Sequence, residues 1–167
     1  MDPFALEARW TPVSPRLRSL RRSLLGLVLG GLALLTLGLS VLIAVVGDAA
    51  AGGITGAVVL VVLALVGALA WRLINRNYLA WGYSERDEDL LVVRGWLFRR
   101  MVVVPYGRMQ FVDVTAGPLQ RRFDLATVQL HTAAAASDAR IPGLPPDEAR
   151  RLRDTLARLG EARSAGL

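Results

Sequence analysis

The sequence contains no cysteine and no lysine, and it has a single histidine, His131. Without cysteine there can be no disulfide, thiolate nucleophile or zinc–thiolate site. His131 stands in a strand-like stretch with no nucleophile motif beside it, so it offers no partnered base for covalent catalysis. The spacings of zinc proteases, phosphate-binding glycine loops and calcium loops are also missing. We therefore expect no enzyme, no metal site and no cofactor.

Charge is scarce in one long block, because Asp48 is the only charged residue between Arg22 and Arg72. The predicted spans are residues 24–46 and residues 54–73, separated by a short loop at 47–53, and the apolar core of the second span ends at Trp71. A helix of 23 residues extends about 34 Å and can cross a hydrocarbon core of roughly 30 Å. The first run is too long for a signal peptide and a second run follows it directly. We predict two transmembrane helices in an antiparallel hairpin, without the ionisable residues typical of a transport pathway.

Arginines flank the hairpin on both sides, whereas the connecting loop carries none. The positive-inside rule then places residues 1–23 and everything after the second span in the cytoplasm. We expect a multi-pass protein of the cell (plasma) membrane with both termini cytoplasmic. Trp71, Tyr78 and Trp81 lie around the second exit, either as interfacial anchors or packed against the following domain.

Residues 74–160 have a different pattern, with short runs rich in β-branched and aromatic residues between turn signals. This pattern is typical of an antiparallel meander, with a last strand around residues 140–142. Pro146 and the acids after it predict the start of a helix whose apolar residues share one face, and Gly160 can cap its end before a tail at 161–167. The predicted fold class is a membrane α-helical hairpin plus a mostly-β domain, a small barrel or sandwich closed by a C-terminal helix.

Three segments of this domain resemble a known family. Residues 104–114, VPYGRMQFVDV, resemble the IPY-x-RIQ-x-V segment of bacterial pleckstrin-homology (PH) domains of the second type, and residues 117–126, GPLQRRFDLA, resemble the family's GPLQR-x-FGLA segment. Residues 141–144 are similar to its I-x-GL ending. Two spans before one such domain resemble the YdbS-like (DUF304-like) subgroup. The matching motif positions are Pro105, Tyr106, Arg108, Gln110, Gly117, Pro118, Leu119, Phe123 and Leu125.

The resemblance implies a PH-like barrel and a membrane-associated accessory or assembly protein whose domains tend to self-associate. It does not imply phosphoinositide binding, because fold does not determine function. Asp124 stands where the family often has glycine, and aspartate tolerates a positive φ better than most residues. The alanine run at 133–136 replaces the glycine-rich turn expected there, which leaves the geometry of that hairpin open.

Arginines also outnumber acids just after the second span, by nine to five over residues 72–123. One interpretation is a basic face drawn to anionic lipid, at about 1 kcal/mol per charge close to the surface. The other is ordinary charge on strand edges that discourages edge pairing. The candidate lipid-facing residues are Arg72, Arg76, Arg99, Arg100, Arg121 and Arg122.

These features favour a membrane-anchored, non-catalytic PH-like binding or assembly module on the cytoplasmic face. It would act through self-association, as a homo-oligomer, or through a related PH-domain membrane protein. The alternative is an anionic-lipid-sensing domain tethered by the helical hairpin. Besides the lipid bilayer, no nucleic acid is expected as a partner, because the arginines are scattered and no recognition motif accompanies them.

Overall fold

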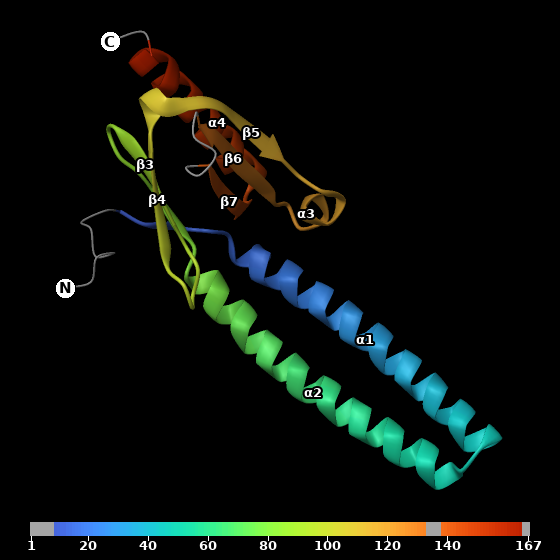
Figure 1. Ribbon diagram of the computed structural model, residues 1–167. Coiled ribbons are helices and arrows are strands. Elements are labelled where there is room, and N and C mark those ends of the chain that lie inside the picture. Colours follow the sequence, from blue (N-terminus) through green and yellow to red (C-terminus); the bar gives the residue numbers. More distant parts are fainter. Residues whose placement is uncertain (1–8, 133–137, 165–167) are drawn as a thin grey trace. The chain divides into compact units, whose positions relative to one another are not determined.

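The computed structural model describes residues 9–132 and 138–164 (Figure 1). The chain divides into two compact units, each treated separately below. A helical unit comprises Arg21–Asn75, and a β unit combines residues 9–20 with the described residues from Arg76 onward.

Two long apolar helices account for the helical unit and extend beyond it: α1, Pro15–Val46, and α2, Ala49–Leu79. Both are long and apolar enough to cross a membrane, as the sequence predicted. Their large apolar side chains are mostly exposed, for example Leu34 at 73% and Val45 at 78%. Asp48, the one charge in the apolar block, begins α2, since its carboxylate oxygens accept hydrogen bonds from the backbone N–H groups of Ala50 and Ala51 at 3.1 and 3.3 Å.

Glycines let the two helices approach each other near their connecting turn. Gly52 and Gly56 are buried, and a Cβ on Gly52 would lie 2.7 Å from the carbonyl oxygen of Ser40. At the opposite end of the helical unit, Arg22 donates a hydrogen bond of 2.9 Å to Asn75, and its guanidinium lies 4.1 Å from the centre of the Trp71 ring. Close backbone approach and a cation–π contact thus fix the pair at its two ends.

Two antiparallel sheets, a short connecting helix and a longer C-terminal helix account for most of the β unit (Figure 1). The first sheet has the order β1-β2-β3-β4, with strands Thr11–Pro12, Gly82–Glu85, Asp89–Arg94 and Arg100–Pro105. A 3₁₀ turn, η1 (Tyr106–Arg108), leads to the second sheet, β5-β6-β7, with strands Met109–Thr115, Ala126–Thr132 and Ala139–Leu144. The short helix α3, Pro118–Arg122, connects β5 to β6, and α4, Pro146–Ser164, follows β7. The predicted fold class is confirmed, although the described strands do not close a barrel.

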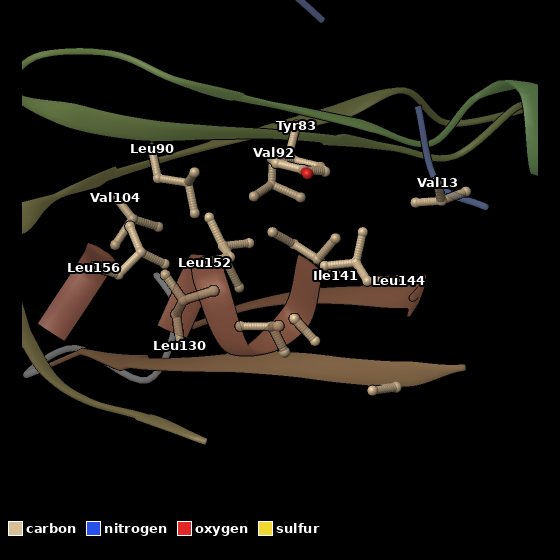
Figure 2. Close-up of a cluster of buried hydrophobic side chains, with 14 of the residues drawn as sticks. Val13, Tyr83, Leu90, Val92, Val104, Leu130, Ile141, Leu144, Leu152 and Leu156 are labelled. Carbon is tan, nitrogen blue, oxygen red and sulfur yellow. The ribbon is translucent and has the colours of Figure 1, made fainter. Parts of the chain in front are cut away.

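The core lies between the two sheets and α4 (Figure 2). Leu90 and Val104 project into it from the first sheet and Leu130 from the second, while α4 supplies Leu152 and Leu156. All five side chains are fully buried. The apolar face predicted for the C-terminal helix is therefore the face that packs on the sheets.

Part of the β unit precedes the transmembrane helices in the chain. Strand β1 pairs with β2, and three side chains from the same N-terminal segment, Val13, Leu17 and Leu20, are buried in the core. The backbone N–H of Ser14 donates to the carbonyl oxygen of Gly143 in β7 at 2.9 Å. Both helices of the hairpin thus lie, along the chain, between the first and second strands of the sheet. A two-residue strand carries no periodic pattern, so the sequence showed no sign of it.

Three sequence details have distinct outcomes. Helix α4 continues through Gly160 to Ser164, so the predicted cap at Gly160 is wrong. This glycine is instead packed close to Met109 and the carbonyl oxygen of Tyr106, where a Cβ would be 3.6 Å from each. Asp124 has φ of 50°, so the turn keeps a positive φ with aspartate in place of glycine. The alanine run at 133–136 lies outside the described residues.

Candidate functional site

The topology gives the first sheet two chemically different ends. In an antiparallel meander the β1–β2 and β3–β4 connections lie at one end, and the β2–β3 turn lies at the other. The register agrees, since Arg94 pairs with Arg100 beside the β3–β4 turn, and Asp89 pairs with Pro105 beside the β2–β3 turn. The chain between β1 and β2 contains both transmembrane helices. It therefore leaves and re-enters the β unit at the end that carries the β3–β4 turn.

The β3–β4 turn exposes three large apolar side chains in a row. Gly95, with φ of 92°, begins the turn, and a side chain there would collide with the carbonyl oxygen of Phe98. Trp96, Leu97 and Phe98 are 39%, 70% and 84% exposed. The guanidinium of Arg76, in the last turn of α2, lies 4.8 Å from the centre of the Trp96 ring. A cation–π contact therefore joins the tip of the turn to the end of α2.

Helix α3 belongs to the same end of the β unit. Asp124, two residues after α3, forms an ion pair of 3.3 Å with Arg16 in the first turn of α1. Gln120 holds α3 in place, because its side chain accepts a hydrogen bond from the N–H of Gly117 at 3.1 Å and donates one to Thr127 at 2.9 Å. These two hydrogen bonds give a structural role to the GPLQ segment.

Five of the six candidate lipid-facing arginines lie at this end of the β unit. Arg76 is in the last turn of α2, Arg99 and Arg100 follow the apolar tip, and Arg121 and Arg122 end α3. All five are exposed. Arg72 is also exposed but belongs to the helical unit. The term basic–aromatic end is used below for the surface formed by Arg76, Leu79, Trp96–Arg100, Leu119, Arg121 and Arg122.

The opposite end of the first sheet is acidic. The β2–β3 turn carries Asp87 and Glu88 and is bordered by Glu85 and Asp89. Arg86 binds Asp89 through two hydrogen bonds of 2.7 and 2.9 Å. These acids form no group able to hold a metal ion among the described residues.

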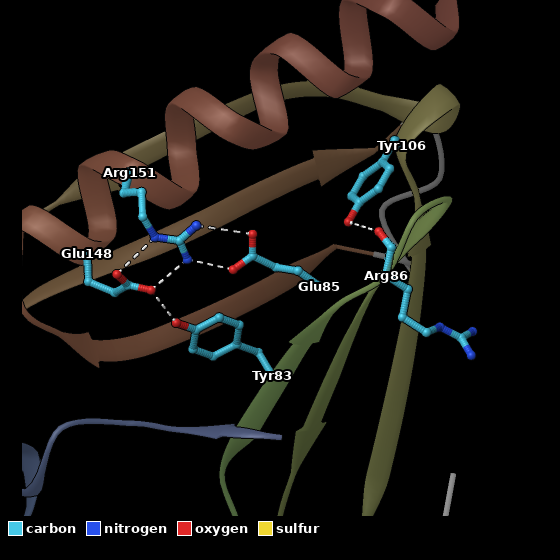
Figure 3. Close-up of polar contacts among 6 residues, drawn as sticks. All are labelled: Tyr83, Glu85, Arg86, Tyr106, Glu148 and Arg151. Carbon is cyan, nitrogen blue, oxygen red and sulfur yellow. Dashed lines mark hydrogen bonds and ion pairs between the residues drawn. The ribbon is translucent and has the colours of Figure 1, made fainter. Parts of the chain in front are cut away.

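Tyr106, a position in the first family segment, connects this acidic turn to η1. Its ring is fully buried, and its hydroxyl donates to the carbonyl oxygen of Arg86 at 2.7 Å (Figure 3). Burial, reinforced by nearby acids, raises the pKa of Tyr106 to about 12. The remaining positions of that segment differ in exposure, since Pro105, Arg108 and Gln110 are exposed. In the second segment Leu125 is buried, Phe123 is half-buried, and Gly117, Pro118 and Leu119 are exposed.

A polar network attaches α4 to β2 (Figure 3). Arg151 binds Glu85 at 2.6 Å and Glu148 at 2.7 Å, and the Tyr83 hydroxyl donates to Glu148 at 2.8 Å. The hydrogen bond from Arg151 lowers the pKa of Glu148. Burial raises the pKa of the Tyr83 hydroxyl. Each carboxylate has Arg151 as its cationic partner, and these charge-assisted hydrogen bonds join α4 to β2 as a structural clamp.

A second surface lies along β5. This strand pairs with β6 on one side, and its other edge carries no strand among the described residues. Between that edge and α4 lies a groove of about 340 Å³, lined by Met109, Phe111, Leu156 and Gly160, among others. Phe111 is 57% exposed and stacks on His131, with ring centres 4.3 Å apart. An unpaired strand edge beside an apolar groove can accept an extended segment of another chain.

The sequence offered the arginines as candidates, but it gave no sign of the apolar tip or of the β5 edge. Trp96, Leu97 and Phe98 have the composition of a buried strand, yet they are exposed in a turn. The β5 edge could be recognised only once the strand order was known.

Comparisons with known proteins agree with the resemblance in the sequence. The family described as "Bacterial PH domain" matches residues 23–160. The UPF0699 transmembrane protein YdbS of Bacillus subtilis (strain 168) is 39% identical over 79 residues, which cover 47% of this chain and 48% of that protein. The match thus spans about half the length of this curated relative. No solved structure matches the chain.

Proposed function

The chain belongs to the bacterial PH domain family, and on that premise we propose that it is a membrane-anchored, non-catalytic assembly module on the cytoplasmic face. The two apolar helices anchor it, and the β unit binds protein. Arginines on both flanks of the hairpin, against Asp48 alone in the loop, support the placement of both termini in the cytoplasm.

The observation that carries this proposal is the edge of β5 beside its groove, which pairs with no strand in the described part of the chain. The register of β5 shifts between Met109 and Phe111, so the regular part of the edge begins at Phe111. A strand added there would gain main-chain hydrogen bonds from β5 and bury its apolar side chains against Phe111 and α4. Such a strand comes from a second copy of the chain or from a related membrane protein.

A structural role for the charged side chains supports the non-catalytic part of the proposal. The ion pairs of Arg151 and of Arg86, at 2.6 to 2.7 Å, hold α4 and the β2–β3 turn in place. Between Arg22 and Arg72 the only charged residue is Asp48, which lies in the loop, and this is typical of an anchor rather than of a transport pathway.

The test is the mass of the full chain, purified in mild detergent, together with the identity of any protein bound in stoichiometric amounts. We expect a discrete oligomer or a one-to-one membrane partner, and loss of that complex in Phe111→Arg, because a charge in the groove would be buried by the added strand. Val103→Arg is the matched control, since Val103 is also apolar and exposed, at 45%, but lies on β4. A monomeric wild-type chain without a partner would contradict the proposal, as would an unchanged complex in Phe111→Arg.

A further inference from the structure

The exposed apolar side chains of the β unit are not scattered. Apart from Val103 and Phe111, every exposed large apolar residue among its described residues lies at the basic–aromatic end: Leu79, Trp96, Leu97, Phe98 and Leu119. Single exposed apolar residues are ordinary, whereas a group of them among charges marks an interaction surface. Here the group is interleaved with five arginines.

Chain connectivity keeps this surface close to the membrane boundary. Trp71 closes the second apolar run, and Arg76 follows five residues later in the same continuous helix. At 1.5 Å per residue, Arg76 lies about 8 Å along α2 from Trp71. The headgroup layer on each side of a bilayer is of similar thickness, roughly 5–8 Å. Because the Trp96 ring is 4.8 Å from the Arg76 guanidinium, the apolar tip lies beside the part of α2 that follows the second apolar run.

We propose that the basic–aromatic end inserts into the headgroup layer of the same bilayer that α1 and α2 cross. Trp96, Leu97 and Phe98 enter the interface, and the surrounding arginines bind the phosphates of anionic phospholipids. The β unit is then a domain that rests on lipid at a defined orientation, rather than one that hangs freely from its anchor.

The chemistry of the residues fits this occupant. Tryptophan is enriched at membrane interfaces, where its ring lies among the headgroups. Arginine binds phosphate through two parallel hydrogen bonds and can extend its charged group to the surface while its stem stays in apolar surroundings. The anionic surface of the cytoplasmic leaflet attracts basic segments and repels acids. The acidic β2–β3 turn lies at the opposite end of the first sheet, so the charge distribution favours one orientation of the β unit.

This inference concerns a different surface from the β5 groove. It does not rest on the proposed assembly role, and either can fail alone. A protein partner covering the apolar tip is the competing occupant, and the experiment below separates it from lipid.

The chain lacks cysteine, so single-cysteine variants need no prior mutagenesis. Phe98→Cys in the full chain, labelled with the fluorophore NBD, would be placed in nanodiscs of phosphatidylcholine and phosphatidylglycerol. Both faces of a nanodisc are accessible to quenchers. Val103→Cys is the matched control on an exposed apolar position away from the tip, and Asp87→Cys reports on the acidic turn. Phe98 is 84% exposed, so its replacement leaves the core intact.

We expect the label at position 98 to emit at shorter wavelength, and to be quenched several-fold more by phosphatidylcholine carrying a shallow nitroxide than the labels at 103 and 87. Aqueous iodide should quench it several-fold less than the label at 87. Equal iodide quenching at 98 and 87 would overturn the proposal. Protection from both iodide and nitroxide lipid would also overturn it, because the tip would then be covered by protein.

A separate part of the experiment tests whether the arginines bind lipid phosphates. Nanodiscs of phosphatidylcholine alone should reduce the nitroxide quenching at position 98, and so should the double variant Arg121→Gln/Arg122→Gln in anionic nanodiscs. Both arginines are exposed at the end of α3, so their replacement does not disturb the core. Quenching that depends on neither the anionic lipid nor these two residues would refute the assignment of phosphate binding to the arginines.

Discussion

Leu17 tests whether the β unit is built from two separated stretches of the chain. It lies in the first turns of α1, is 3% exposed, and packs directly over Gly143 in β7. A Cβ on Gly143 would lie 2.7 Å from Leu17 side-chain carbons, so no second side chain fits between them. Leu17→Ala therefore leaves a cavity between the N-terminal segment and the second sheet.

The expected loss in the free energy of unfolding is that of truncating a leucine in a packed core. Leucine-to-alanine substitutions in cores cost about 2–5 kcal/mol, which is a large share of the roughly 5–15 kcal/mol that stabilises a typical domain. Because the first turn of a helix can partly collapse into such a cavity, we expect about 2–3 kcal/mol. For a unit of about 100 residues this lowers the melting temperature by at least about 8 °C.

The assay is thermal unfolding of the full chain in detergent, combined with hydrogen exchange of the β6 amides in the centre of the second sheet. Leu34→Ala is the matched control, since it makes the same substitution in the same helix at a side chain that is 73% exposed. It should change the stability of the β unit by no more than about 0.5 kcal/mol. If Leu17→Ala and Leu34→Ala have the same melting temperature and the same β6 exchange, the N-terminal segment is not part of the β unit.

Three further predictions concern ionisation and helix packing. Because the pKa of Tyr106 is raised to about 12 in the folded protein, the free energy of unfolding should hold up to about pH 10 and fall as pH rises from there to 12. In unfolding curves measured against pH, Tyr106→Phe should reduce this loss and leave the part due to Tyr83, whose pKa is also raised by burial. The hydrogen bond from Arg151 lowers the pKa of Glu148, so ionised Glu148 stabilises the fold above its unfolded pKa near 4.3, and this stabilisation is lost as pH falls through the folded pKa. In acid unfolding curves, Glu148→Gln should lack this pH-dependent loss of stability. A curve identical to that of the unmodified chain would argue against the clamp. Gly56→Leu should push α2 away from α1, and cysteine pairs placed across the two helices should then cross-link more weakly. Gly53→Leu is the control and should leave cross-linking unchanged, because a Cβ there meets nothing within 4 Å.

Local patterns predicted most elements of the fold. Each depends on neighbours within one stretch of chain: an apolar run long enough for a bilayer, alternating strands between turn signals, and an apolar helical face starting at Pro146. The family segments added the PH-like architecture, and the positive φ of Asp124 agrees with the glycine that the family often has there. The end of α4 was misplaced because the helix continues through Gly160 to Ser164, and a sequence pattern does not distinguish a glycine inside a helix from one that caps it.

The sequence by itself determined the two apolar helices, the strand-rich composition of the following domain and its family, because these properties belong to single stretches of residues. The tertiary structure decided which distant stretches meet. Strand β1 has two residues, too few for any periodicity, and Leu17 lies in a helix that reads simply as the approach to a membrane span. Arg76 and Trp96 come together because an antiparallel meander returns alternate connections to one end of a sheet. That convergence depends on strand order and register, which arise from packing between residues far apart in the chain.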